Sequence, residues 1–373
     1  MEPTVKLKAR MIVLLLMMGL GIQAQDTAQY SFFIAGHTYG KPGVNNPGLH
    51  PPFKQKFEYI KSRDEIKFGV LTGDIVSPNP TAQDWDEVDA DIAELGLPVY
   101  FAVGNHDMEN RPLYESRYGD TYYYFIFHND LFVVLDPNID AWNISGDQLQ
   151  FMKNTVNDNY ETVDNIFVLF HQFLWWEKDN IYSQLKPNSF AGRADTINFW
   201  SEIEPFFHQL PNKVFFLAGD MGAAWWSSDF TYDSYDNLSY VCSGMGEEIG
   251  DNFVILNIDS TKKVSYDLIC LNTEDLNCFG DLTDYQISPS SIVSQTLNIK
   301  VFPNPAKDFL NIKFKTNGRD ASINLYNIDG RLLKKDRCNT CNKTLDLSNL
   351  PGGLYFLTIT TDLYQKTFKV IIQ

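Results

Sequence analysis

The sequence predicts two folded parts, an α/β domain followed by a small β-sandwich. Between residues 28 and 283, short apolar strands alternate with amphipathic helices, as in strand–helix units built around a mostly parallel sheet. After residue 297 the helices stop, and alternating strands are separated by Asn-Pro, Asn-Gly and Asp-Gly turns. A polar, serine-rich stretch, 284–296, is typical of a linker between the two parts.

The first 24 residues stand apart from both predicted domains. Lys6, Lys8 and Arg10 precede an apolar run, 11–22, which ends close to the small residue Ala24. This is the shape of a secretory signal peptide, and the run is too short to span a bilayer. We therefore expect cleavage after Ala24 and an exported mature protein in which disulfides are permitted.

The five cysteines all lie in the second half of the chain, at positions 242, 270, 278, 338 and 341. Cys270 and Cys278 are candidates for one bridge. The Cys338-Asn339-Thr340-Cys341 stretch indicates a disulfide or two idle thiols, since no second pair follows that would complete a zinc site.

The net charge of −17 excludes nucleic acid as an expected partner, because phosphates reward clustered Lys and Arg. The same charge favours solubility, and acidic side chains supply hard metal ligands. The apolar fraction of 44% is enough to fill the cores of two domains.

The elements of the first domain follow from apolar periodicity and turn residues. Thr81 is a candidate N-cap, and Ser145 with Gln148 forms a capping-box pattern. Helices are expected at 53–61, 81–95, after Ser145, and at 195–210. Strands are expected at 31–35, 68–71, 99–103, 166–170, 214–218, 239–242, 253–257 and 264–268, with a hairpin formed by 121–127 and 131–135.

Five of these strands are each followed by a side chain suited to metal binding. In open α/β sheets the functional crevice lies at the carboxyl ends of the strands, so these side chains are expected to meet there. Their carboxylate, amide and imidazole donors suit divalent zinc, manganese or iron. The candidate residues are His37, Asp74, Asn105 with His106, His171, and Asp220.

This series resembles the calcineurin-like metallophosphoesterases over residues 28–275. The motifs that carry the resemblance are Gly73-Asp74, Gly104-Asn105-His106-Asp107, His171 and Gly219-Asp220-Met221-Gly222. The resemblance implies an αββα sandwich and two metal ions bridged by Asp74, with Asn105 and His171 on the second ion. It also implies hydrolysis by a metal-activated hydroxide, with His106 and Asp107 as the catalytic residues and His106 assisting the leaving group.

Two motifs depart from that family. Its first motif, Asp-x-His, is replaced by His37-Thr38-Tyr39, and its last, Gly-His-x-His, by Gly219-Asp220-Met221-Gly222. Tyr39 would serve as a phenolate ligand only if its pKa fell, and Gly222 has no side chain. The expected metal ligands are therefore His37, Asp74, Asn105, His171 and Asp220. A one-metal enzyme, an altered two-metal enzyme and a lineage without catalysis all remain open.

Aromatic and basic residues near the late strands allow two interpretations each. Trp175, Trp176, Trp225 and Trp226 either wall a pocket for a ring-bearing leaving group or belong to the core. Arg111 and Arg193 either contact a phosphate or form surface ion pairs.

The C-terminal part, residues 297–373, resembles the C-terminal sorting domain of the bacterial type IX secretion system. Stretches 301–306, 325–331 and 350–355 carry the resemblance, as does the basic and apolar end of the chain. It implies outer-membrane translocation by the secretion machinery, followed by release or surface attachment. The alternative is an Ig-like adhesion module.

Together these features predict a secreted or surface-attached, metal-dependent phosphoesterase that acts on phosphomonoesters or phosphodiesters. One or two divalent ions are the expected cofactor, and no transmembrane segment is expected in the mature chain. The rival hypotheses are a non-catalytic surface binding protein on the same scaffold and a structural adhesin.

Overall fold

The computed structural model describes residues 29–44, 46–246, 249–287, 300–314, 321–328, 330–338, 341–361 and 364–373. The expected signal peptide, residues 1–24, lies outside these ranges, as does most of the expected linker. The side chains of Cys338 and Cys341 also lie outside the described set, so their pairing stays a prediction.

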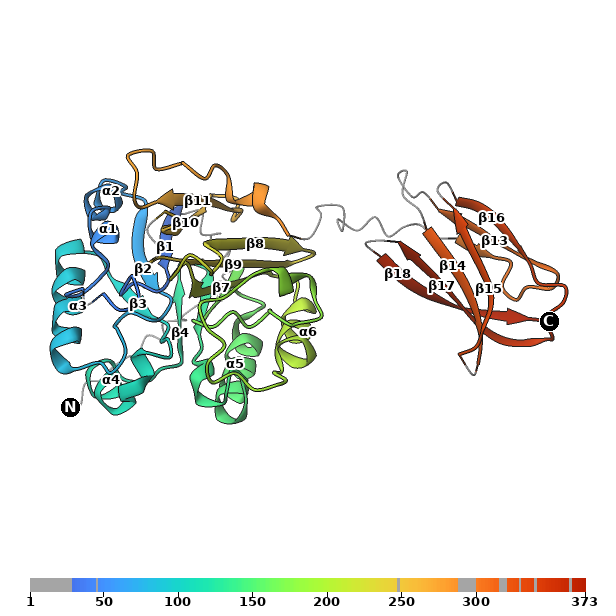
Figure 1. Cartoon of the computed structure of the whole chain (residues 1–373), viewed down its shortest axis with the longest axis horizontal. Coiled ribbons are helices and arrows are strands. Elements are labelled where there is room, and N and C mark those ends of the chain that lie inside the picture. Colours follow the sequence, from blue (N-terminus) through green and yellow to red (C-terminus); the bar gives the residue numbers. More distant parts are fainter. Residues whose placement is uncertain are drawn as a thin grey trace, which may run out of the picture.

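Two mixed sheets form the first domain (Figure 1). The five-stranded sheet has the order β11-β10-β1-β2-β3, in which β1, β2 and β3 run parallel. The six-stranded sheet has the order β4-β5-β6-β7-β9-β8, with β5, β6, β7 and β9 parallel. The strands are β1 Tyr30–Ala35, β2 Ile66–Leu71, β3 Val99–Phe101, β4 Tyr123–Phe127, β5 Asp130–Val134, β6 Asn165–Leu169, β7 Lys213–Met221, β8 Phe230–Tyr235, β9 Leu238–Gly244, β10 Asn252–Ile258 and β11 Val264–Cys270.

The strands β1, β5 and β6 are buried along their whole length, as expected for strands of a sheet that is covered on both sides. Between the sheets, aromatic rings stack on each other, for example those of Phe32 and Phe68 at 5.2 Å and those of Phe132 and Phe167 at 4.8 Å. The outer faces are covered by helices (Figure 1). The predicted αββα sandwich is therefore confirmed.

The helices match the predictions in place but not always in length. Helix α3 (Ala82–Leu95) begins at Thr81, whose side chain forms a reciprocal capping box with Asp84. The segment 53–61 contains two short helices, α1 (Pro51–Lys54) and α2 (Phe57–Lys61). The segment 195–210 is helical only from a π-turn, η4 (Phe199–Ile203), through α6 (Glu204–His208).

The predicted capping box at Ser145 is wrong, although helix α5 (Gly146–Asn159) begins there. The Ser145 hydroxyl donates to Asp140 instead of capping the helix. Gln148 turns inward, where its side chain bonds the backbone N–H and carbonyl of Asp136. The remaining helix of this domain is α4 (Arg111–Tyr118), preceded by the 3-10 turn η1 (Asp107–Asn110).

The structure contains the predicted Cys270–Cys278 disulfide, which closes the loop after β11. Cys242 is a buried free thiol. No helix in the described ranges has the length and apolar character needed to cross a bilayer.

The C-terminal strands form two further sheets around their own core, as the sequence predicts. One sheet has the order β12-β13-β16, the other β15-β14-β17-β18. Their core includes Leu310, Ile323, Leu325 and Leu357. The strands are β12 Lys300–Phe302, β13 Phe309–Phe314, β14 Ala321–Asn327, β15 Leu332–Cys338, β16 Cys341–Asp346, β17 Gly353–Thr361 and β18 Tyr364–Ile372. The limits assigned to the domains and the linker stay predictions.

Candidate metal centre

A single buried carboxylate lies at the centre of the candidate site. Asp74 follows β2 and is 2% exposed. Its Oδ2 atom lies 3.4 Å from Nε2 of His171, 3.6 Å from Nε2 of His106 and 3.9 Å from Nε2 of His37. The loops after β1, β2, β3 and β6 thus bring one carboxylate and three imidazoles together.

Two of these imidazoles are oriented by backbone carbonyls. Nδ1 of His171 lies 2.8 Å from the carbonyl oxygen of Thr72, and Nδ1 of His37 lies 3.0 Å from that of Met245. Because a carbonyl only accepts, Nδ1 carries the hydrogen in each ring. In the neutral imidazole, Nε2 then presents its lone pair toward Asp74. Metal-binding histidines are typically held in this way.

Asp220 adds a second carboxylate from the end of β7. Its Oδ1 lies 3.8 Å from Nε2 of His171, and the residue is 1% exposed. Among the described residues, neither carboxylate oxygen of Asp220 has a hydrogen-bond partner, and nor does Nε2 of His171. Buried polar atoms are normally satisfied, so these atoms favour a bound group between them.

Burial and the neighbouring charges shift the pKa values of the residues in this cluster. Burial lowers the pKa of His171, but Asp74 and Asp220 outweigh it and raise that pKa to about 10. Burial likewise raises the pKa of Asp74, yet the three imidazoles hold it well below its usual range. Burial raises the pKa of Asp220 to about 8, against the opposing pull of His171. Without a metal, a proton on His171 provides the positive charge that this cluster requires.

His37 and Tyr39 form the opposite side of the site. Burial lowers the pKa of His37 to about 4, so its ring is neutral at pH 7. The Tyr39 ring lies 4.3 Å from the His37 ring and 5.6 Å from the His106 ring. Burial and the carboxylates of Asp74 and Asp220 raise the pKa of Tyr39 far above its usual range. Without a bound metal, Tyr39 is therefore a neutral phenol at pH 7.

Asp107 lies fully buried behind the site. Its Oδ1 accepts from the backbone N–H groups of Ile75 (2.9 Å) and Val76 (3.1 Å), and its Oδ2 from that of Gly104 (2.7 Å). It thereby joins the loops that follow β2 and β3. A side chain at Gly104 would collide with Asp74, which explains the glycine. Asp107 thus has the contacts of a positioning residue, and its predicted catalytic role stays untested.

Glu109 is a site residue that sequence reasoning missed. Its Oε1 lies 3.1 Å from Nδ1 of His106, and its Oε2 accepts from the backbone N–H of Asn79 at 2.6 Å. His106 also donates its own backbone N–H to Oδ1 of Asp74 at 3.1 Å. The spacing of three residues between His106 and Glu109 was the available signal, because the 3-10 turn η1 places such residues on one face.

The structure shows the surroundings of the two candidate arginines and of the four candidate tryptophans. Arg111 pairs with the buried Asp136 at 2.8 Å, and Arg193 with Glu177 at 2.7 Å. Both arginines are thus ion-paired within the protein. Trp175 is buried in the core, whereas Trp225 is 84% exposed. Trp176 is partly buried and Trp226 is 49% exposed.

Asn105 is partly buried in the turn between β3 and η1, next to His106. Its part as a ligand stays a prediction.

Two known protein families match this chain. The sequence profile of the calcineurin-like phosphoesterases matches residues 37–244, more than half of the chain. The chain belongs to the calcineurin-like phosphoesterase family. A second profile, that of the secretion system C-terminal sorting domain, matches residues 300–373. Both predicted resemblances are thus confirmed.

Solved structures similar to this phosphoesterase-family chain share little sequence with it. A purple acid phosphatase from yellow lupin (Lupinus luteus) is 14% identical with a TM-score of 0.45, covering 84% of this chain and 54% of its own. A proposed 5'-nucleotidase from Staphylococcus aureus is 13% identical with a TM-score of 0.40, covering 66% and 55%. The chain therefore spans about half the length of these two proteins. A Thermus thermophilus protein is 9% identical with a TM-score of 0.37, covering 64% and 98%. The comparison with curated proteins gave no match.

The departure of the last motif from the family has a structural explanation at Gly222. Its φ of +73° lies in the left-handed region. A Cβ atom there would come within 2.7 Å of the Gly244 backbone and 3.0 Å of the Met245 nitrogen. The backbone of this chain thus excludes the histidine that the last family motif places here.

The remaining donors suit a divalent ion. Donor atoms bonded at about 2.1 Å to one tetrahedral ion lie about 3.4 Å apart, close to the 3.4 Å between Asp74 and His171 and the 3.8 Å between His171 and Asp220. Within the described ranges, however, no group of three or more His, Cys, Asp and Glu side chains forms an assembled metal site. The donor set thus fits a metal chemically, and metal binding by it is a proposal.

Proposed function

We propose that this protein is an exported, metal-dependent phosphoesterase that hydrolyses phosphomonoester or phosphodiester bonds. The observation that carries the proposal is the cluster around Asp74: a buried carboxylate facing three imidazole nitrogens, beside the second carboxylate, Asp220, whose oxygens accept no hydrogen bond among the described residues. Such a cluster is costly for folding alone. It is useful where a cation and a phosphoryl group must bind.

Asp74, Asn105, His171 and Asp220 would hold one divalent ion, with zinc, manganese or iron the best matches to these donors. His37 would extend the set on the side where the family has its other ion. A bound ion supplies Lewis acidity toward a phosphoryl oxygen and lowers the pKa of water. The chain's own residues bind the ion, orient the catalytic histidine and move a proton.

His106 is placed for proton transfer to the leaving group. It is the most exposed of the three imidazoles, with 23% of its side chain accessible, compared with 2% for His37 and none for His171. Glu109 holds its Nδ1, and its Nε2 lies at the partly exposed edge of the cluster, 3.6 Å from Oδ2 of Asp74. A proton on Nε2 can therefore reach a departing ester oxygen. Asp107 supports this arrangement by holding the two loops that carry Asp74 and His106.

The test combines metal analysis with turnover. We expect purified protein to contain tightly bound divalent metal and to hydrolyse bis(4-nitrophenyl) phosphate or 4-nitrophenyl phosphate, with chelation removing both. Metal-replete protein that turns over neither ester would support the second hypothesis, a non-catalytic surface binding protein. That alternative draws on the first and last motifs, where Tyr39 is a neutral phenol and Gly222 excludes a side chain.

The C-terminal domain carries the proposal on export. It belongs to the sorting-domain family, has a core of its own and contributes no described residue to the cluster around Asp74. Deleting residues 290–373 should leave the protein in the periplasm with its catalytic domain folded. A truncated protein that reaches the cell surface normally would contradict this role.

A further inference from the structure

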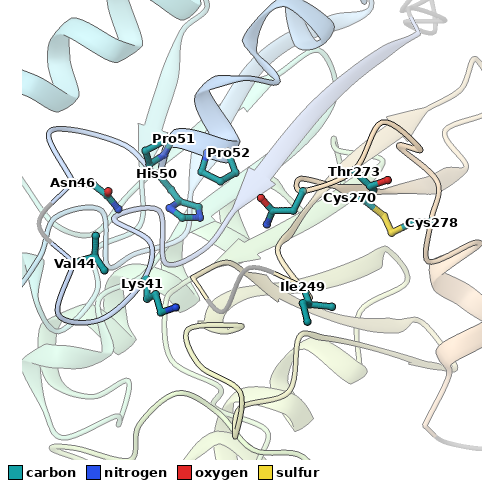
Figure 2. A pocket seen from close by; sticks show the side chains of 11 residues that line it. Lys41, Val44, Asn46, His50, Pro51, Pro52, Ile249, Cys270, Thr273 and Cys278 are labelled. Atoms are coloured by element: carbon teal, nitrogen blue, oxygen red, sulfur yellow. A yellow bond between two sulfur atoms is a disulfide. The ribbon is translucent and has the colours of Figure 1, made fainter.

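Two cavities of the first domain are lined by residues other than those around Asp74. One, of about 650 Å³, lies between the loop after β1 and the Cys270–Cys278 disulfide (Figure 2). The two amides in its lining, those of Asn46 and Asn272, already donate hydrogen bonds to other residues of the protein. The other cavity, of about 390 Å³, has a largely aromatic lining, and its volume lies within the range of sites that hold small organic molecules.

The aromatic cavity lies at the edge of the five-stranded sheet, where β3 is the last strand. Tyr123, from β4 of the other sheet, closes this edge. Its hydroxyl accepts from the N–H of Phe101 at 3.1 Å and donates to the Phe101 carbonyl at 2.9 Å. These bonds occupy backbone groups to which a further strand would bind. The cavity therefore favours a small molecule over a strand added to the sheet.

Aromatic rings border this cavity from several directions. The aromatic residues of its lining are Tyr100, Phe101, Tyr114, Tyr118 and Tyr123. The Tyr118 ring lies 5.1 Å from both the Phe101 ring and the Tyr114 ring, at interplanar angles of 82° and 50°. Because the face of an aromatic ring carries partial negative charge, a cavity bordered by such rings attracts a cation.

The charged residues near the cavity favour the same class of ligand. Asp120 is the charged residue of the lining, and it is exposed. The Tyr118 hydroxyl donates to Oδ1 of Asp89 at 2.8 Å, which makes the Tyr118 ring richer in electrons. Arg117 lies outside the lining, with its guanidinium 5.7 Å from the Tyr118 ring, and it bonds Asp86 at 2.8 Å and Asp89 at 2.6 Å. Three carboxylates against one guanidinium leave a net negative charge here, as in the whole chain with its −17.

The hydrogen bonds of the lining distinguish between organic cations. The hydroxyls of Tyr118 and Tyr123 already donate within the protein. A primary ammonium group would therefore lose more hydrogen bonds to water than it recovers in the cavity. A quaternary ammonium group has no N–H to satisfy, and its methyl groups contact ring faces favourably.

We propose that this cavity is a binding site for a small quaternary ammonium group, such as that of choline. The site is separate from the proposed phosphoesterase activity and does not depend on it, because its lining shares no residue with the candidate metal centre. A free solute and a lipid headgroup can both present this group.

Calorimetry on the full-length protein tests the site with choline and with 3,3-dimethyl-1-butanol, the uncharged molecule of the same shape. Tyr118→Leu removes one ring of the lining, and Asp120→Asn removes the exposed charge with little change of shape. Tyr124→Leu and Asp158→Asn are the matched controls, since both residues are exposed and outside the lining.

We expect choline to bind wild type about ten-fold more tightly than the uncharged molecule does, and to bind Tyr118→Leu about five-fold more weakly than wild type. Asp120→Asn should weaken choline binding about two- to five-fold, and both controls should bind choline as wild type does. Sedimentation with vesicles then distinguishes the source: pelleting with phosphatidylcholine but not with phosphatidylglycerol assigns a lipid headgroup, and pelleting with neither assigns a free solute.

The proposal is overturned if choline does not bind wild type, or if the uncharged molecule binds equally well. It is also overturned if folded Tyr118→Leu protein binds choline as tightly as wild type. Should Tyr118→Leu fail to fold, the uncharged molecule and the surface variant Asp120→Asn decide, and unchanged choline binding by Asp120→Asn then contradicts the site.

Discussion

The two sides of the candidate metal centre differ in what they offer a metal ion. On one side, three buried residues offer oxygen and nitrogen donors. Nε2 of His171 lies 3.4 Å from Oδ2 of Asp74 and 3.8 Å from Oδ1 of Asp220. On the other side, His37 offers one imidazole, Tyr39 is a phenol whose pKa is raised, and Gly222 offers nothing. Both sides lie at the carboxyl ends of the same sheets, so the fold alone does not decide how many ions bind.

Backbone packing limits the number of metal donors on the side of His37, Tyr39 and Gly222. At Gly222 the Gly244 backbone occupies the space that a side chain would need. We therefore favour one tightly held ion over two. Substitutions on both sides of the centre test this inference.

Asp74→Asn should remove both metal and activity. The carboxylate that would neutralise the cation is lost, while an amide oxygen still accepts the His106 N–H and asparagine tolerates the left-handed φ of +48°. We expect metal content at background by elemental analysis and turnover lower by about 10³-fold or more. Asp130→Asn is the control, a buried carboxylate bonded to Tyr30 and Asn165. Unchanged metal content in Asp74→Asn would contradict the proposed centre.

His106→Ala should retain most of the metal yet slow turnover by about 10²–10⁴-fold, the scale of a lost acid–base group. The expectation follows from its exposure and from its place at the edge of the cluster. His208→Ala, at a surface histidine paired with Glu204 and Asp236, should leave turnover unchanged. If His106→Ala instead loses its metal, His106 is a ligand rather than a proton donor.

Gly222→His tests the excluded side and should lower the free energy of unfolding by about 2–4 kcal/mol, from left-handed strain and collision with the Gly244 backbone. Gly192→His is the matched control, because Gly192 has a φ of +74° and nothing within 4 Å of a Cβ atom. It should lose only about 1 kcal/mol. Denaturant unfolding of both measures the difference. A Gly222→His protein as stable as wild type, with a second equivalent of metal, would show that this side can be rebuilt.

Glu109→Gln should have the smallest effect, about a ten-fold fall in kcat with unchanged KM and metal content. The His106–Glu109 bond orients the imidazole, so the double variant His106→Ala/Glu109→Gln should be no slower than His106→Ala. Glu115→Gln, which loses only a surface contact to Arg111, serves as control. Additive losses in the double variant would rule out positioning through His106.

Much of this site could be predicted from the chain because the signal is local. An apolar strand ending in glycine and then a donor recurs at Gly36-His37, Gly73-Asp74, Gly104-Asn105 and Gly219-Asp220, and the structure gathers these strand ends. Glu109 was missed because its spacing of three residues from His106 brings the two side chains together only in a helical turn, and the 3-10 turn η1 was not predicted. The prediction of a capping box at Ser145 is wrong because both side chains bond residues outside the helix. Ser145 bonds Asp140, and Gln148 bonds Asp136.

The sequence predicted the α/β class, the C-terminal β-sandwich and the order of the candidate ligands, because each depends on periodicity, turn residues or short spacing. It left Cys270 and Cys278 as candidates for a bridge, which the structure contains. Tertiary structure alone decided which nitrogen of each histidine faces Asp74, why Tyr39 stays protonated and why Gly222 admits no side chain. These properties depend on carbonyls, carboxylates and backbone from distant strands, such as Thr72, Met245 and Gly244. Contacts of this kind exist only once the two sheets have packed together.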